Sequence, residues 1–95
     1  MPKAYWIANV TVTDPDAYKG YQAIAPAAFA EFGACFLARG DAETLEGTRW
    51  ERRVIIEFPS MDAARACYAS DMYRKARAAR ADACTADIAL IEALD

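Results

Sequence analysis

The chain has 95 residues, a formal net charge of −3, no histidine and three cysteines, and 56% of its residues are hydrophobic. This length fits a single domain over residues 1–95, and no run approaches the roughly 20 apolar residues of a membrane span. The first residues resemble neither a signal nor a transit peptide, so we expect a cytoplasmic protein. The missing histidine excludes a Ser-His-Asp triad, a histidine zinc site and an axial-histidine haem, and we expect no metal and no cofactor.

The cysteines and the basic residues exclude further classes. Cys35, Cys67 and Cys84 form no Cys-x-x-Cys pair, which indicates neither a disulfide framework nor a zinc knuckle. Five of the eleven basic residues lie between positions 65 and 80, and a basic helix can bind nucleic acid. However, the sequence pI is about 4.9, and an RNA-binding sheet would show exposed aromatic residues among basic ones. We therefore expect neither nucleic acid nor a membrane as a partner.

Residues 3–12 alternate in the way typical of a strand, with Trp6 and Val10 on one face and Tyr5 and Ile7 on the other. Both faces of this strand therefore carry large apolar side chains.

A helix is expected next. Asp14 can cap a helix that begins at Pro15, because proline at the first position loses only an N–H group that would be unpaired there. The helix should run to about residue 32 and end at Gly33. Pro26 cannot donate to the helix ladder, so we expect it to kink the helix or split it in two.

The later elements follow from similar signals, with Pro59 ending one strand and Ser60 and Ser70 or Asp71 capping helices. In chain order we expect a strand at 34–38, a turn at 39–41, a short extended piece at 43–46, a strand at 50–58, helices at 61–69 and on to about 83, and a strand at 85–94.

This βαββαβ order predicts an α+β ferredoxin-like sandwich: a four-stranded antiparallel sheet with the helices on one face. In a monomer of this kind the second face of the sheet contacts water, so half of each strand should be polar. Instead Ile55 lies opposite Ile56, and Ile91 lies opposite Leu90. We therefore predict a homodimer that buries the second sheet face of each copy and forms a dimeric α+β barrel.

Several strings occur in order along nearly the whole chain: Tyr5-Trp6-Ile7-Ala8, Val12-Thr13-Asp14-Pro15 with Tyr18, Phe36-Leu37-Ala38-Arg39-Gly40, Leu45-Glu46-Gly47, Val54-Ile55-Ile56-Glu57-Phe58-Pro59-Ser60, and Tyr68-Ala69-Ser70 with Tyr73. Together these strings resemble the domain of unknown function 1330 family. The resemblance implies a dimeric ferredoxin-like α+β barrel without a firmly assigned activity.

The sequence departs from this family at two places. Members usually read Ser-Pro-Glu-Tyr where this chain has Ser70-Asp71-Met72-Tyr73, and Gly-Gly where it has Gly40-Asp41. The resemblance therefore predicts the start of the last helix and the turn after Arg39 less precisely than the other elements.

Two polar strand residues are candidate catalytic groups. Glu57 lies among apolar neighbours, where a carboxylate can have a raised pKa and transfer a proton, or it can pair with an arginine. Asn9 could stabilise an oxyanion, or it could form a hydrogen bond across a dimer axis. For Glu57 we favour a structural role, either an ion pair with an arginine or a position facing water at a strand end, and we leave both interpretations open for Asn9.

Two arginines are candidate anchors for a substrate carboxylate. Arg39 precedes a turn, where its guanidinium could bind a carboxylate with two hydrogen bonds or form a salt bridge to Glu46 or Glu57. Arg80 matches an arginine that is frequent in the family resembled, and it would be the best anion anchor if it points inward. The remaining candidates for substrate binding are aromatic residues that could line a pocket or simply form core: Trp6, Tyr18, Tyr21, Tyr68 and Tyr73.

Three functions are compatible with these residues. The first is a cofactor-free oxygenase-like or isomerase-like enzyme acting on a small apolar or acidic metabolite, by fold analogy. The second is a non-catalytic dimer that binds a ligand or another protein. The third is a tautomerase that uses the secondary amine of Pro2, which requires removal of Met1.

Overall fold

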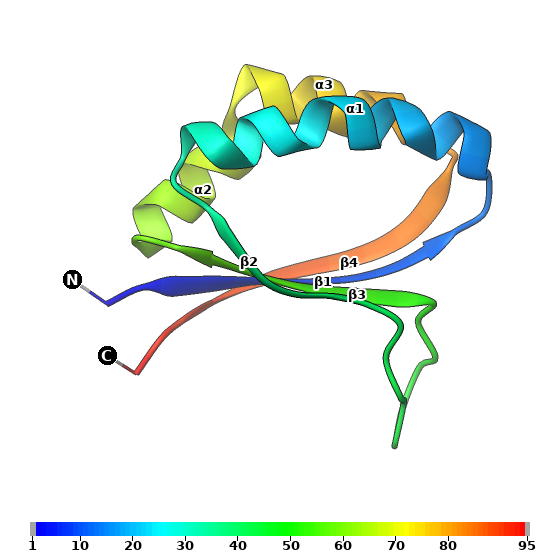
Figure 1. The fold of residues 1–95 in the computed structure, drawn as a ribbon, viewed down its shortest axis with the longest axis horizontal. Helices are drawn as coiled ribbons and strands as arrows, with labels where there is room; N and C mark the ends of the chain where they lie inside the picture. The colour runs from blue at the N-terminus through cyan, green and yellow to red at the C-terminus, as the bar shows by residue number, and fades with distance from the viewer. Residues whose placement is uncertain (1, 95) are drawn as a thin grey trace.

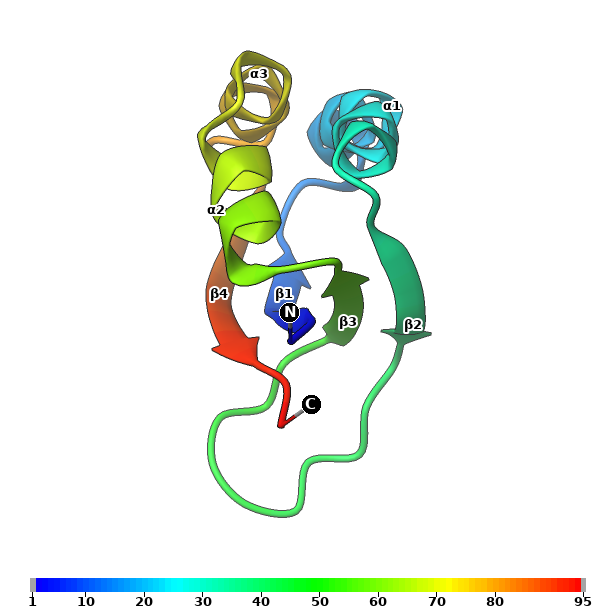
Figure 2. The same cartoon turned by 90° about the vertical axis from the view of Figure 1, so that its left-hand side faces the viewer.

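The computed structural model describes residues 2–94, and all helices cover one face of a four-stranded sheet (Figure 1). The elements are β1 (Ala4–Val12), α1 (Pro15–Glu31), β2 (Cys35–Gly40), β3 (Arg52–Phe58), α2 (Met61–Ala69), α3 (Asp71–Ala79) and β4 (Cys84–Glu92). The sheet is antiparallel in the order β2-β3-β1-β4, with β2 and β4 at its edges (Figure 2). The predicted ferredoxin-like α+β fold is therefore confirmed.

The helix signals in the sequence act as predicted. Asp14 accepts a hydrogen bond from the Ala17 N–H at 3.2 Å, and Pro15 is the first residue of α1. Gly33 follows the helix with φ of +74°, a backbone conformation that glycine adopts freely but that is strained for residues with a side chain.

The helix α1 continues through Pro26, so of the two predicted outcomes, a kink or a split, the split does not occur. Proline removes the N–H group that would donate to the Gln22 carbonyl. Both Gln22 and Pro26 are exposed, so water can hydrate this carbonyl and the cost of the lost bond stays small.

Some predicted boundaries also differ. Residues 41–51 form an irregular loop on the side of the sheet away from the helices, without the extended piece expected at 43–46 (Figure 1). The Glu51 N–H donates to the Thr11 hydroxyl, and β3 begins at Arg52. The last helix ends at Ala79, because residues 80–83 close a turn in which the Ala83 N–H donates to the Arg80 carbonyl at 2.9 Å.

The core lies between the helices and the inner face of the sheet. Trp6 is 1% exposed and makes T-shaped contacts with Phe29 and Tyr73, with ring centroids 5.2 Å apart in both cases. α1 and α3 approach closely at Gly20, where an added Cβ would lie 3.3 Å from the Ala79 Cβ. The inner face of the sheet is thus covered by this chain itself.

The outer face of the sheet carries apolar side chains that no described segment covers. Ile7 pairs with Ile55 across β1 and β3, and Tyr5 pairs with Ile91 across β1 and β4. Ile55 is 37% exposed and Ile91 is 55% exposed. Large apolar side chains therefore occur on both faces of the strands, as predicted. Among residues 2–94, no helix has both the length and the apolar character that crossing a membrane requires.

Candidate functional site

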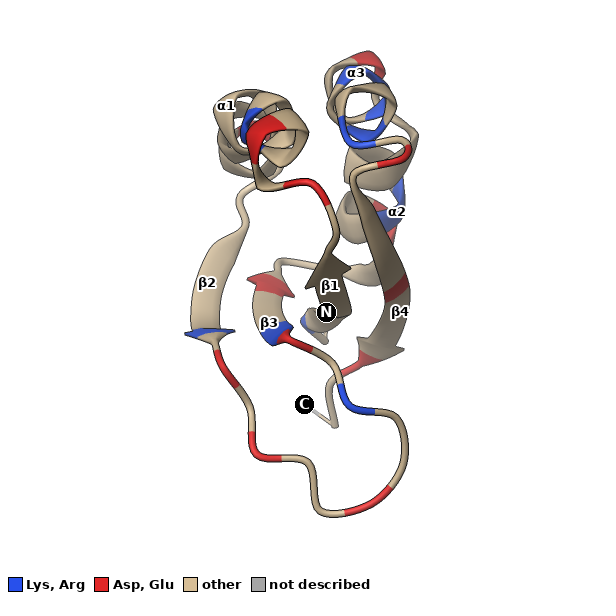
Figure 3. Cartoon of the chain, turned by 90° about the vertical axis from the view of Figure 1, so that its right-hand side faces the viewer, with Lys and Arg blue, Asp and Glu red and all other residues tan. Residues whose placement is uncertain are grey.

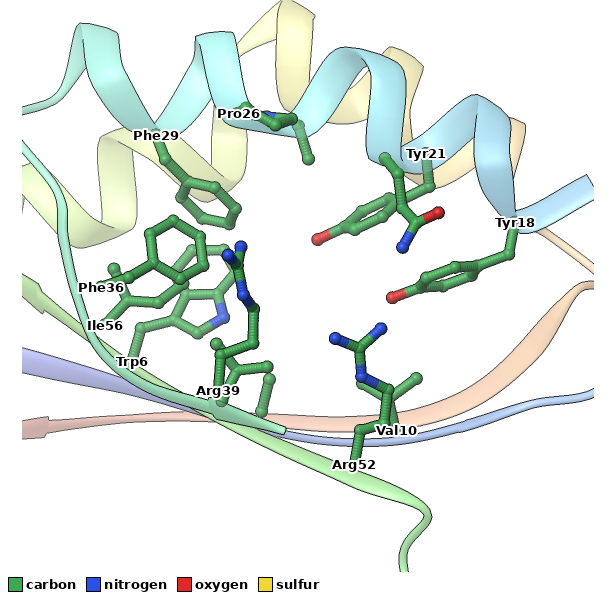
Figure 4. A pocket seen from close by; sticks show the side chains of 14 residues that line it. Trp6, Val10, Tyr18, Tyr21, Pro26, Phe29, Phe36, Arg39, Arg52 and Ile56 are labelled. Atoms are coloured by element: carbon green, nitrogen blue, oxygen red, sulfur yellow. The ribbon is translucent and has the colours of Figure 1, made fainter. Parts of the chain in front are cut away.

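A cavity of about 380 Å³ lies between α1 and the inner face of β1, β2 and β3 (Figure 4). This volume lies at the lower end of the range of pockets that hold small molecules. Its lining residues are Trp6, Ala8, Val10, Tyr18, Tyr21, Gln22, Ala25, Pro26, Phe29, Phe36, Arg39, Arg52, Val54 and Ile56. We call this cavity the α1 pocket.

Aromatic rings from three elements form the walls of the α1 pocket. Tyr18, Tyr21 and Phe29 lie on the face of α1 that looks toward the sheet, because their successive spacings of three and eight residues keep them on one side of a helix. Trp6 comes from the inner face of β1, and Phe36 comes from β2 and makes a T-shaped contact with Phe29. Such walls fit a flat apolar or aromatic group.

Two arginines enter the α1 pocket from the sheet, Arg39 from β2 and Arg52 from β3 (Figure 4). Arg39 lies over the Phe36 ring, with its guanidinium carbon 4.9 Å from the centroid. In the described part of the chain neither arginine forms an ion pair with a carboxylate. Two guanidinium groups are therefore available to an anion in the pocket.

A β-bulge explains why Arg39 points inward. The register of β2 against β3 shifts between Phe36 and Ala38, so that Phe36 pairs with Ile56 and Arg39 pairs with Val54. Phe36 and Arg39 are three residues apart and would lie on opposite faces of a regular strand. The bulge therefore brings the ring and the guanidinium to the same pocket.

The tyrosines of the pocket are held as neutral hydroxyls. The Tyr21 and Tyr73 hydroxyl oxygens are 2.8 Å apart and share a hydrogen bond. Burial raises the pKa of both groups above the usual value, and it also raises the pKa of Tyr18. These phenols therefore stay protonated at neutral pH, and the hydroxyls of Tyr18 and Tyr21, which line the pocket, can form hydrogen bonds with a ligand.

The structure brings some of the predicted site residues together. Trp6, Tyr18, Tyr21 and Arg39 all line the α1 pocket. Tyr73 is 0% exposed and supports the pocket from behind through Tyr21.

The other predicted binding residues lie elsewhere. Tyr68 and Arg80 line a second hollow, which lies beside β4 at the opposite edge of the sheet from β2. Their roles in substrate binding stay predictions.

The two predicted catalytic residues also lie apart from the α1 pocket. Glu57 is on the outer face of the sheet, where its carboxylate pairs with the Lys3 ammonium at 3.1 Å. Asn9 faces the same side, with Arg53 and Asp87 as its partners in the strand register. The structure does not bring them together with Arg39, and their roles stay predictions.

Sequence reasoning missed Arg52 and Gln22. Arg52, Val54 and Ile56 are alternate residues of β3, so their side chains lie on the same face, the one that the helices cover. This alternation can be read in the sequence and predicts the position of Arg52. Gln22 directly follows Tyr21 on α1; it is exposed and also lines the pocket. A prediction that assigned the pocket to the helical side of the sheet could have found Arg52.

Pro2, the residue that the tautomerase alternative requires, does not line the α1 pocket. Pro2 borders a surface hollow with Ser60, Met61, Asp62, Arg65 and Glu92. Whether Met1 is removed lies outside the described residues. Among residues 2–94, no group of three or more histidine, cysteine or acidic side chains is placed to hold a metal ion.

The fold and the pocket define a small ferredoxin-like α+β protein with an aromatic cavity under its first helix. The chain belongs to the family described as "Domain of unknown function (DUF1330)", whose sequence profile matches residues 3–94. No curated protein matches the sequence.

Solved structures share this fold. A protein of unknown function from Rhodopseudomonas palustris is 21% identical with a TM-score of 0.76, and the match covers 99% of this chain and 84% of that one. SnoaB, a cofactor-independent oxygenase from Streptomyces nogalater, is 18% identical with a TM-score of 0.71, covering 100% and 96%. A dimeric ferredoxin-like protein of unknown function from Thermobifida fusca is 20% identical with a TM-score of 0.64, covering 97% and 92%.

Proposed function

We propose that the α1 pocket binds a small aromatic carboxylate. The observation that carries this proposal is the pair of guanidinium groups, Arg39 and Arg52, that reach into an aromatic cavity without carboxylate partners among the described residues. A guanidinium in a partly desolvated site binds a carboxylate through short, charge-assisted hydrogen bonds. The rings of the pocket would enclose the apolar part of the ligand.

Tryptophan fluorescence tests this binding. Trp6 lines the pocket, and a Trp50→Phe background leaves Trp6 as the reporter. We expect phenylacetate to change the emission of Trp6, and phenylacetamide, which has the same ring without the charge, to bind at least tenfold more weakly. Equal affinity of the acid and the amide, or no response to either, would contradict the proposal.

Matched arginine variants locate the anchor. Loss of one charge-assisted hydrogen bond costs about 1.5–3 kcal/mol, so Arg39→Gln or Arg52→Gln should weaken phenylacetate binding about tenfold or more. Arg49→Gln is the control, because Arg49 is exposed in the loop and does not line the pocket. Wild-type affinity in both pocket variants would contradict the proposal that Arg39 and Arg52 bind the carboxylate.

Catalytic turnover of the bound acid is a second candidate, favoured by the buried phenols in the same pocket. The protonated hydroxyls of Tyr18 and Tyr21 could donate to negative charge that develops on a substrate. SnoaB, which shares the fold, is a cofactor-independent oxygenase. Oxygen uptake with an established pocket ligand, lost in Tyr21→Phe, would support an oxygenase; binding without turnover would support a non-catalytic binding protein.

We also propose that the protein is a homodimer through the outer face of the sheet. Ile55 and Ile91 on this face, and Leu45 in the adjoining loop, are large apolar side chains that are exposed in one copy. The outer face of a second copy can bury these side chains, which no described segment of the same chain covers. Solved proteins of the same fold from Thermobifida fusca and Bacteroides fragilis are described as dimeric. Sedimentation at micromolar concentration tests the proposal, and a 10.4 kDa species would contradict it.

A further inference from the structure

A second hollow of about 480 Å³ lies between the α2–α3 segment and the edge strand β4. Its lining residues are Arg65, Tyr68, Arg80, Ala86, Ile88 and Leu90, and none of them lines the α1 pocket. We call it the β4 groove. We propose that the β4 groove binds a carboxylate with an unbranched apolar tail, with the carboxylate on Arg80 and the tail along β4. This proposal is independent of the function proposed for the α1 pocket.

The floor of the β4 groove is apolar and elongated. Ala86, Ile88 and Leu90 are alternate residues of β4, so their side chains lie on the same face of the sheet. All three are only partly buried, although they lie on the face that the helices cover. Five strand residues span about 13 Å. A floor of this shape fits an extended chain of methylene groups better than a compact ring.

Arg80 supplies a cation at the α3 end of the groove. Its Nη1 donates to the Cys84 sulfur at 3.5 Å, and its guanidinium carbon lies 4.9 Å from the Tyr21 ring centroid. Its Nε is buried and has no hydrogen-bond partner in the described chain. A buried guanidinium nitrogen without an acceptor costs free energy. No carboxylate of residues 2–94 pairs with the Arg80 guanidinium, so a ligand carboxylate would be its ion-pair partner.

The guanidinium of Arg80 stays charged in this position. Burial lowers the pKa of Arg80, but the hydrogen bond to Cys84 and the two tyrosine hydroxyls nearby more than offset this effect. The pKa therefore lies above its ordinary value. An anion entering the groove would meet a full positive charge.

The rest of the rim is also basic. The guanidinium carbon of Arg77 lies 4.2 Å from the Tyr68 ring centroid, and Nη1 of Arg77 donates to the Tyr68 hydroxyl at 3.0 Å. These contacts hold the Tyr68 ring at the groove. Arg65 lines the groove and pairs with Asp62 at the surface. The helix α3 carries three basic residues and one acidic residue, although the chain as a whole has a net charge of −3 (Figure 3). This local charge favours an anion over a neutral lipid.

Decanoate titrated into methyl-labelled protein tests the proposal without any substitution. We expect saturable shifts of the Ile88 and Leu90 methyl resonances, while those of Val54 and Ile56 report separately on any binding in the α1 pocket. Decanol should bind at least tenfold more weakly, because it lacks the charge. Shifts confined to Val54 and Ile56, or equal affinity for decanol, would overturn the proposal.

Two variants and one further probe complete the test. Arg80→Gln should weaken decanoate binding about tenfold or more, whereas Arg74→Gln should leave it unchanged, because Arg74 is exposed on α3 and does not line the groove. Inorganic phosphate should bind much more weakly than decanoate if the apolar floor contributes. Equal affinity for phosphate, or wild-type affinity in Arg80→Gln, would contradict the proposed site.

Discussion

The proposed dimer makes a quantitative prediction for Ile91. This side chain is 55% exposed on the outer face, where it pairs with Tyr5 of β1. Complete burial of an isoleucine side chain stabilises by about 1.5–3 kcal/mol, so the part left for a second copy is worth roughly 1 kcal/mol. Because a two-fold dimer contains the residue twice, Ile91→Ala should cost about 2 kcal/mol per dimer, or about 30-fold in the dissociation constant.

Sedimentation equilibrium over a range of protein concentrations measures this change. Met72→Ala is the matched control, because Met72 is a 36% exposed apolar residue on α3, in the helical layer on the opposite side of the sheet. We expect Met72→Ala to dimerise like the wild type. An unchanged dissociation constant for Ile91→Ala, or equal weakening by both substitutions, would refute the assignment of the outer face as the interface.

Three further predictions concern stability. Since burial raises the pKa of Tyr21 above its usual value of 10.0, its contribution to the free energy of unfolding should be constant up to about pH 10 and fall above it; urea denaturation above pH 10 should show a smaller fall in Tyr21→Phe. Ser60→Ala removes the acceptor of the Ala63 N–H at the start of α2 and should cost about 1 kcal/mol, visible as a melting temperature lower by roughly 5 °C. Gly33→Ala introduces a side chain at φ of +74°, with its Cβ 3.2 Å from the Pro59 ring, and should cost at least about 1 kcal/mol in the same melting experiment.

Most of the fold could be predicted from local signals. Asp14 with Pro15, and Gly33 after the helix, set both ends of α1, and the alternation around Trp6 identified β1 and its two apolar faces. These signals act through neighbouring residues and need no knowledge of the rest of the chain. The effect of Pro26 was different, because it depends on whether the neighbouring carbonyl can contact water in the folded protein.

The candidate site was predicted less completely. Asn9 and Trp6 have opposite parity on β1, so alternation already separated this amide from a pocket on the helical side. The inward position of Arg39 depends on the bulge in β2, which sequence alternation does not reveal. The separation of Arg80 from Arg39 depends on the path of the helices over the sheet, which is a property of the whole fold.

The seven residues of β3 contribute side chains both to the α1 pocket and to the outer face of the sheet, the proposed dimer interface. Arg52, Val54 and Ile56 face the α1 pocket, while the intervening Arg53 and Ile55 face the other way. Saturation mutagenesis along this strand should therefore produce phenotypes that alternate with a period of two, ligand affinity changing at one position and assembly at the next. Inserting a single residue into β3 would exchange these surfaces and so impair both properties at once.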